Sequence, residues 1–421
     1  MSTARLERGR VAVIGGGYAG MAAAVTLAER GVPVTVFESA PVVGGRARRV
    51  RTQGHELDNG QHVLAGAYSE LLHLMRKVGV PTDAVLRLPF ELRYADGFAM
   101  RALWLPAPLG LLGGLLAAHR IPLSERFAAV RFMRALRRSE FRVTPDCTVE
   151  ALLARHRQDG RIGHYLWQPL CVSALNTPPQ LASAQVFARV LRDSLAGAPG
   201  ASDLLLPRVD LSRLFPEHAA EYLQANGGEL RTGCSVREVT PQLAVDRERF
   251  ARIVLAVGPH QLQPFAALVG ALPAFDYQPI YTCYLQYAAG VKLPYPMLGL
   301  ASGLVQWVFD RGALLGEKGR LVCVISAQGD HQQMAHEVIA AACHRELALA
   351  LRHLPDPLWH QVIAEKRATV ACTPGLAHPG PRTATAGLFL AGDYTDPEYP
   401  PTLEAAVRSG VRAARLALET E

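Results

Sequence analysis

The feature that most constrains the fold is a glycine-rich turn near the start of the 421-residue chain. Residues 11–14 read VAVI, a short apolar strand, and Gly15, Gly17 and Gly20 follow in a G-x-G-x-x-G spacing. In a βαβ unit the first glycine allows the tight turn, the second lets the backbone approach a pyrophosphate, and the third lets the helix pack against the strand. The stretch predicts a dinucleotide-binding turn, and we count Ala19 among its cofactor-binding positions.

A second strand over residues 32–37 ends in Glu38, 18 residues after Gly20. An acid at this distance can reach a ribose 2′-hydroxyl, and its charge favours a free hydroxyl over a 2′-phosphate. A glycine turn alone could be purely structural. Because strand, helix, second strand and acid all fall within one unit, we interpret it as a nucleotide site.

A second glycine turn decides between NAD and FAD. Gly44, Gly45 and Arg46 resemble the paired-glycine-plus-arginine signature that follows the first unit in the flavin amine oxidase and carotenoid desaturase superfamily. The resemblance implies FAD, with Arg46 as a fixed cation near its diphosphate. An ordinary Gly-Gly loop is the alternative.

Composition limits the remaining function classes. A hydrophobic content of 49% supports a large core and two domains. Seven scattered cysteines with no C-x-x-C pair predict a reducing compartment and no zinc or other metal framework. The first ten residues contain no apolar signal segment, so we expect a cytoplasmic protein. The net charge of +7 suits an anionic membrane face better than nucleic acid, because no Lys/Arg run interleaves with the few aromatic residues.

The segment 103–138 is the candidate membrane patch. Residues 103–118 carry no charge, but their prolines and glycines would break a spanning helix. The helix that follows combines apolar and basic faces, as an interfacial helix does: Phe127, Val130, Met133 and Leu136 lie beside Arg126, Arg131, Arg134, Arg137 and Arg138. We interpret the segment as a monotopic patch and a doorway for a lipophilic substrate. A buried helix pair with a solvated basic face is the alternative.

A polar motif follows the second glycine turn, at Asp58 to His62. In the superfamily an acid-x-Gly at this point lies beside the flavin, so the resemblance places Gly60 and Gln61 there. Asp58 and His62 are candidate general acids, since burial can keep a carboxyl group protonated. A turn acid and a structural histidine are the alternatives.

The second half of the sequence contains the remaining expected cofactor-binding positions. After a mostly helical middle region, resemblance to the superfamily places Val236 at the adenine, and residues 278–327 predict an antiparallel sheet under the substrate. The strand before Gly392 and Asp393 ends in the crevice where open α/β sheets bind ligands. The superfamily uses this Gly-Asp pair at the ribityl-diphosphate. The helix N-terminus that follows faces the flavin O2 side, with its first residues Thr402, Leu403 and Glu404; Glu404 is either a dipole-favoured acid or a third candidate near the ring.

Longer phrases point to a narrower family. DNGQHVLAGAY at 58–68, ALNTPP at 174–179 and GDYTDPEYPPTLEAAV at 392–407 resemble the squalene-associated FAD-dependent desaturases, the hydroxysqualene dehydroxylase family. The resemblance implies reductive removal of the hydroxyl of hydroxysqualene, a C30 isoprenoid, to give squalene for squalene and hopanoid biosynthesis. The electron donor is unknown. Without this resemblance, the residues alone predict only a flavoprotein oxidoreductase with an apolar substrate.

We therefore predict an α/β fold with two interleaved domains. The FAD-binding Rossmann-like domain comprises 1–95, 221–265 and 361–421, and the α+β substrate domain comprises 96–220 and 266–360, with an antiparallel sheet and a helical membrane-facing insertion. The protein would be peripheral on the inner face of the cell membrane. A carotenoid- or phytoene-type desaturase and a non-catalytic prenyl-lipid-binding flavoprotein are the alternative functions; a flavin amine oxidase fits less well.

Overall fold

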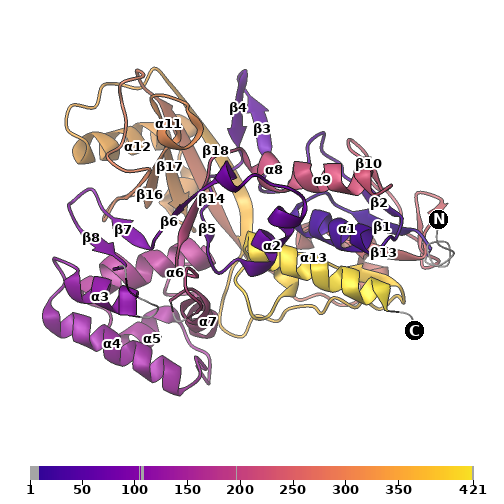
Figure 1. Ribbon diagram of the computed structural model, residues 1–421, viewed down its shortest axis with the longest axis horizontal. Coiled ribbons are helices and arrows are strands. Elements are labelled where there is room, and N and C mark those ends of the chain that lie inside the picture. Colours follow the sequence, from indigo (N-terminus) through magenta and orange to yellow (C-terminus); the bar gives the residue numbers. More distant parts are fainter. Residues whose placement is uncertain (1–8, 104, 106–108, 196, 420–421) are drawn as a thin grey trace.

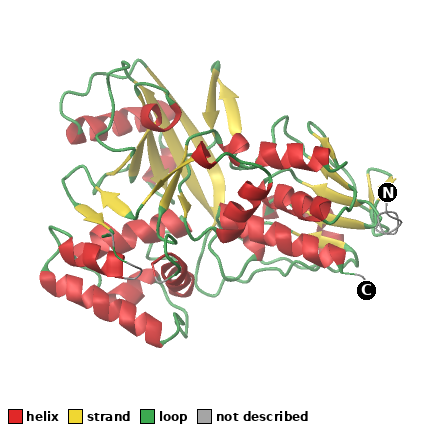
Figure 2. Cartoon of the chain, viewed as in Figure 1, coloured by secondary structure: helices red, strands yellow, loops and turns green. Residues whose placement is uncertain are grey.

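The computed structural model describes residues 9–103, 105, 109–195 and 197–419. A parallel sheet with its helices stands beside an antiparallel sheet with its own helices (Figures 1 and 2). The parallel part lies on the right of Figure 1, together with both chain ends. The mixed α/β class predicted from the sequence is confirmed.

The parallel sheet is assembled from separated parts of the chain. Its strand order is β10 (Glu229–Arg231), β2 (Val34–Phe37), β1 (Val11–Ile14), β13 (Arg252–Leu255) and β19 (Leu388–Leu390). Val11 and Val13 pack in one core with the helices α1 (Tyr18–Glu29), α9 (Pro216–Ala225) and α13 (Leu403–Leu418). Ala12 and Ile14 point to the opposite core, which includes α10 (Ala266–Val269) and the hairpin of β11 (Ala244–Val245) and β12 (Glu248–Arg249). The inner strands β1, β2 and β13 are almost entirely apolar and buried because both faces of the sheet are covered, whereas the edge strand β10 carries Glu229 and Arg231.

The antiparallel sheet has the order β15 (Met297–Gly299), β16 (Trp307–Asp310), β17 (Arg320–Ser326), β14 (Tyr277–Gln286) and β18 (Trp359–Val370). One face of β14 and β17 packs under α12 (His336–Ala350). The alternate residues, among them Tyr284 and Val324, face the helical part of the molecule. The expected sheet is present, and its two faces have different neighbours.

The helical part lies at the lower left of Figure 1 and contains α3 (Leu109–Ala117), α4 (Leu123–Arg138), α5 (Val149–Arg155), a π-helical turn (Gly163–Trp167), α6 (Gln168–Leu175) and α7 (Ala184–Leu195). Shorter elements join the parts: β3 (Arg49–Thr52), β4 (His55–Asp58), β5 (Leu64–Ala65), α2 (Ser69–Lys77), β6 (Val85–Leu88), β7 (Glu91–Arg93), β8 (Ala99–Arg101), β9 (Leu204–Pro207), α8 (Leu211–Leu214) and α11 (Arg311–Leu315).

One domain boundary differs from the sequence expectation. Residues 361–370, assigned there to the nucleotide-binding unit, belong to β18 and pair with β14 in the antiparallel sheet. The fourth of the predicted domain boundaries, between residues 360 and 361, therefore falls inside a strand of the antiparallel sheet.

The candidate membrane patch also differs in detail. Leu136 of α4 is buried in the protein core, and Val130 and Met133 pack partly against it. Three of the four residues predicted to face outward are therefore turned into the protein, because the same apolar spacing suits a protein core, whereas Phe127 is exposed. The large apolar side chains that are exposed here lie before and at the start of α3 and in the first turns of α4: Leu103, Leu105, Leu109, Leu123 and Phe127.

Residues 104 and 106–108 of the patch lie outside the described residues. In the part of the chain that is described, no helix has both the length and the apolar character needed to cross a bilayer.

Candidate active site

A single cavity of about 1030 Å³ joins the two halves of the molecule. At one end it is lined by the glycine turns and the carboxyl ends of the parallel strands, and at the other by side chains of the antiparallel sheet and of α6. It contains most of the expected cofactor positions: Gly15, Gly17, Ala19, Glu38, Gly44, Gly45, Arg46, Gly60, Gln61, Val236, Gly392, Asp393, Thr402 and Leu403.

The two glycine turns face each other across the cavity wall. Gly17 and Gly44 form a parallel backbone bridge, and a Cβ placed on Gly45 would lie 3.1 Å from the Cα of Gly17. Side chains here would fill the space that a phosphate needs to reach the backbone. Gly20 lies outside the lining, because its place is against the strand: a Cβ there would lie 1.8 Å from the carbonyl oxygen of Gly15.

Glu38 lies at the end of β2, where the cavity meets the parallel sheet. Its carboxylate accepts hydrogen bonds from the backbone N–H groups of Gly16 (2.6 Å) and Ala40 (2.7 Å). These bonds hold the carboxylate in a nearly buried position. The carbonyl oxygen of Glu38 accepts from the backbone N–H of Cys234 (2.8 Å), two residues before Val236, and all three residues belong to the lining.

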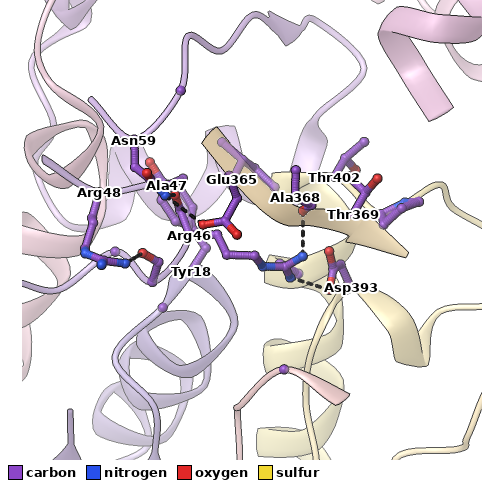
Figure 3. A pocket seen from close by; sticks show the side chains of 18 of the residues that line it. Tyr18, Arg46, Ala47, Arg48, Asn59, Glu365, Ala368, Thr369, Asp393 and Thr402 are labelled. Atoms are coloured by element: carbon purple, nitrogen blue, oxygen red, sulfur yellow. Dashed lines mark hydrogen bonds and ion pairs between the residues drawn. The ribbon is translucent and has the colours of Figure 1, made fainter. Parts of the chain in front are cut away.

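Arg46 connects three segments that are far apart in the sequence. Its guanidinium donates to the carbonyl oxygen of Ala368 (2.7 Å) and to Oδ1 of Asp393 (2.7 Å), as Figure 3 shows. Burial opposes the charge, but Asp393, together with Glu365 and Tyr277, raises the pKa of Arg46 above its usual value. The second glycine turn, β18 and the loop after β19 thus meet at one fixed cation.

Unsatisfied polar atoms test whether a cofactor fits here. Gln61 Oε1 and the Tyr394 hydroxyl are buried in the cavity lining and have no hydrogen-bond partner among the described residues. Buried polar atoms normally find partners. Hydroxyl and N–H groups of a bound flavin dinucleotide would satisfy them, and the side-chain-free glycine cradle with Arg46 suits its diphosphate.

The other end of the cavity is apolar and runs across the strands. Ile280 of β14 pairs with Glu365 of β18 and with Ser326 of β17, and Trp307 of β16 pairs with Val324. From Ile280 on β14 to Met297 on β15 the lining spans three strand spacings, about 14 Å at ~4.8 Å each. Further apolar side chains complete it: Phe90, Leu92, Leu170 and Phe309. The shape suits an elongated apolar molecule.

Asp58 is not among the described residues that line this cavity. Its Oδ2 accepts from Arg311 (2.9 Å) and its Oδ1 from the backbone N–H of Leu211 (2.9 Å). Burial raises the pKa of Asp58 and Arg311 opposes that rise. With both oxygens engaged away from the cavity, Asp58 is no longer a candidate proton donor.

Glu404 is also turned away from the cavity lining. Its fully buried carboxylate accepts from the backbone N–H groups of Glu70 (3.1 Å) and Leu71 (2.9 Å) and pairs with Arg408 (2.7 Å). It therefore caps α2 and fastens that helix to α13. Thr402, which accepts from the N–H of Ala405, is the cap that faces the cavity.

His62 is the one sequence-predicted donor in the lining. Its Nδ1 lies 3.4 Å from the carbonyl oxygen of Gly60. Burial lowers the pKa of His62 and the nearby Arg46 lowers it further, against the opposing effect of Gly60. The imidazole is therefore harder to protonate than a free histidine.

Sequence reasoning missed the contribution of β18. Glu365, Lys366, Arg367 and Thr369 line the cavity, and Glu365 accepts from Nδ2 of Asn59 (3.0 Å; Figure 3). The sequence feature that could have revealed this contribution is Glu-Lys-Arg, a run of three charged residues within an otherwise alternating strand. Only the pairing of β18 with β14 shows that this part of the chain lines the cavity.

Comparison with known proteins is consistent with this geometry. Residues 18–418 match the family described as flavin-containing amine oxidoreductase. The chain is 31% identical to a protein of Rhodopseudomonas palustris named hydroxysqualene dehydroxylase, over 97% of this chain and 98% of that one. It is 25% identical to a probable zeta-carotene desaturase of Synechococcus elongatus, over 98% and 99%.

Solved structures share the fold. An oxidoreductase from Methanosarcina mazei superposes with a TM-score of 0.74 at 16% identity, covering 97% of this chain and 100% of that one. A putrescine oxidase variant gives a TM-score of 0.71 at 17% identity, covering 98% and 99%.

Proposed function

The chain belongs to the flavin-containing amine oxidoreductases and, within them, to the hydroxysqualene dehydroxylase family, and on this premise we propose that it converts hydroxysqualene to squalene. Its cofactor is FAD. The observation that carries the proposal is the single cavity that leads from the glycine cradle to an apolar chamber across the antiparallel sheet. A long isoprenoid alcohol can lie there with its hydroxyl-bearing carbon towards the cofactor.

The residues of the cradle would hold FAD in a defined order. Glu38 would bind the adenosine ribose beside Val236, and the two glycine turns with Arg46 would hold the diphosphate. The Gly60–His62 loop and the N-terminus of α13, at Thr402 and Leu403, would border the flavin ring. The dipole of α13 favours negative charge at this end of the helix.

The proposed reaction is a reductive dehydroxylation. The allylic C–O bond breaks, the hydroxyl leaves as water with one proton from the protein, and a hydride takes its place on carbon. FAD, when bound and reduced, supplies that hydride. The protein supplies position, exclusion of water by the apolar lining, and the proton, for which His62 is the remaining candidate among those predicted.

A dependence on pH follows if His62 provides the proton. Its pKa is lowered from 6.5, so the protonated fraction increases only as the pH falls below that value. We expect kcat to increase as the pH falls through the lowered pKa, and His62→Gln to remove that increase. FAD absorbance should show equal cofactor occupancy in both proteins. An unchanged pH dependence in His62→Gln would exclude this role.

A carotenoid-type desaturase is the second candidate, favoured by the similarity to the zeta-carotene desaturase. That reaction runs in the oxidative direction. Anaerobic incubation with reduced FAD separates the two: a dehydroxylase forms squalene, whereas a desaturase needs an oxidant and extends a polyene. A lipid-binding protein without catalysis would bind the substrate and leave the flavin absorbance unchanged.

We also propose that the α3–α4 region rests on an anionic membrane, on the inner face of the cell membrane. The exposed apolar residues of this region lie beside exposed arginines of α4. Phe90 and Leu92 line the apolar end of the cavity, Leu92 pairs with Met100 of β8, and β8 contacts α3. An apolar substrate could therefore pass from lipid into the chamber.

Charge reversal on α4 tests this surface. We expect the combined replacement of its four exposed arginines by glutamate to weaken binding to anionic liposomes at least tenfold, since each cation near such a surface contributes about 1 kcal/mol: Arg131, Arg134, Arg137 and Arg138. The control reverses the same number of exposed arginines elsewhere: Arg30, Arg237, Arg247 and Arg352. Equal co-sedimentation of both variants with anionic liposomes would count against the surface.

A further inference from the structure

A buried ion pair lies directly behind the cofactor end of the cavity. Arg311 is the first residue of α11 and is 2% exposed. Its Nη1 donates to Asp58 Oδ2 (2.9 Å), while Nε and Nη2 hold both oxygens of Glu317 (2.9 and 2.8 Å). A buried charge of this kind is tolerated only when such partners are complete.

Asp58 accepts hydrogen bonds from two further residues. Its Oδ1 accepts from the N–H of Leu211, and its carbonyl oxygen accepts from the Tyr284 hydroxyl (2.8 Å). The guanidinium of Arg311 also lies over the ring of Tyr284, 5.7 Å from its centroid. Asp58 is thus fixed to β14, to α8 and to the start of α11.

The residues on either side of this pair line the two ends of the cavity. Residues 59–62 follow Asp58 directly and border the cofactor end, whereas Trp307 and Phe309, just before Arg311 in the chain, border the apolar end. The loop 59–62 lies outside any helix or strand, and Gly60 has a φ of +137°. Its position therefore depends on anchors outside itself.

We infer that Arg311 and Tyr284 are positioning residues that, through Asp58, hold the loop 59–62 against the flavin and in a fixed relation to the strand lining the substrate chamber. The inference rests on the proposed function insofar as this loop faces FAD. A displacement of about 1 Å at a reacting centre can lower the rate about a hundredfold.

The test compares variants that separate position from stability. Arg311→Met alone leaves Asp58 charged and buried, and we expect it to unfold readily. The double variant Asp58→Asn/Arg311→Met removes both charges, so it should fold and bind FAD. We expect it to show a shifted flavin absorbance spectrum, a shifted reduction midpoint, and a kcat about 10- to 100-fold lower at little changed KM. Tyr284→Phe, which removes one hydroxyl, should shift the spectrum in the same direction by less.

A second arginine–carboxylate pair, outside the cavity lining, serves as control. Asp396 is 1% exposed and pairs with Arg412 (2.8 Å), and neither is among the described residues of the lining. We expect Asp396→Asn/Arg412→Met to keep the parent spectrum and kcat. A parent-like spectrum, midpoint and kcat in both Asp58→Asn/Arg311→Met and Tyr284→Phe would overturn the inference. The spectral comparison needs no substrate, so failure of the proposed reaction is a separate result.

Discussion

Replacing Gly17 by valine is expected to give a folded protein that purifies without flavin. Gly17 has an ordinary extended backbone, with φ −75° and ψ −179°, so a side chain causes no backbone strain. An added Cβ would meet the Cα of Gly45 at 3.6 Å, an ordinary contact. The methyl groups would instead occupy the cradle between the two glycine turns. Losing two hydrogen bonds to a charged phosphate, about 1.5–3 kcal/mol each, lowers FAD affinity at least a hundredfold.

The measurement is the ratio of flavin to protein absorbance after purification, together with the Kd for FAD from quenching of its fluorescence. Gly290→Val is the matched control, because a Cβ at Gly290 meets no atom of the described residues within 4 Å. We expect this control to bind FAD like the parent. Parent-like affinity in Gly17→Val would show that the cofactor does not use this cradle.

Arg46→Met is expected to lose both cofactor affinity and stability. Removing the cation near the diphosphate should weaken FAD binding about 10- to 100-fold. It also leaves Asp393, which is 4% exposed, without its ion-pair partner, at a cost of about 1–3 kcal/mol in the free energy of unfolding.

The double variant Arg46→Met/Asp393→Asn separates these two effects. It should recover most of the stability, since no buried charge remains unpaired, but not the FAD affinity. Thermal unfolding of the flavin-free proteins measures the first quantity and fluorescence titration with FAD the second. If FAD affinity returns with stability, then Arg46 acts only through the fold.

The nucleotide half could be predicted because its signals are local. The turn at Gly15 to Gly20 and the acid at Glu38 lie within one βαβ unit, so sequence spacing translates directly into distance. Arg46 and Asp393 were each predicted at the diphosphate. Their ion pair was not, because it joins positions that only the folded chain brings together.

Asp58 and Glu404 illustrate what spacing cannot decide. Both belong to segments that border the cavity, yet one side chain pairs with Arg311 and the other caps α2. The direction of a side chain at a loop or in a first helical turn depends on neighbours from distant segments. The same limit applies to Leu136, since a protein core and a lipid surface select the same apolar spacing on a helix.

The sequence predicted the antiparallel sheet beside the substrate chamber, but not the residues that line the chamber. Alternating strands indicated the antiparallel sheet, but the lining residues depend on register, and a shift of one residue would reverse every side chain. Glu365 of β18 lines the cavity for this reason, because it lies opposite Ile280 on the same face of the sheet.

A single-turnover experiment tests the central claim most directly. The purified protein with its FAD fully reduced is mixed anaerobically with hydroxysqualene, while flavin absorbance and the lipid products, by mass spectrometry, are followed together. We predict that oxidised flavin and squalene appear at the same rate and in equal amounts. Recovery of unchanged hydroxysqualene beside flavin that remains reduced would contradict the account.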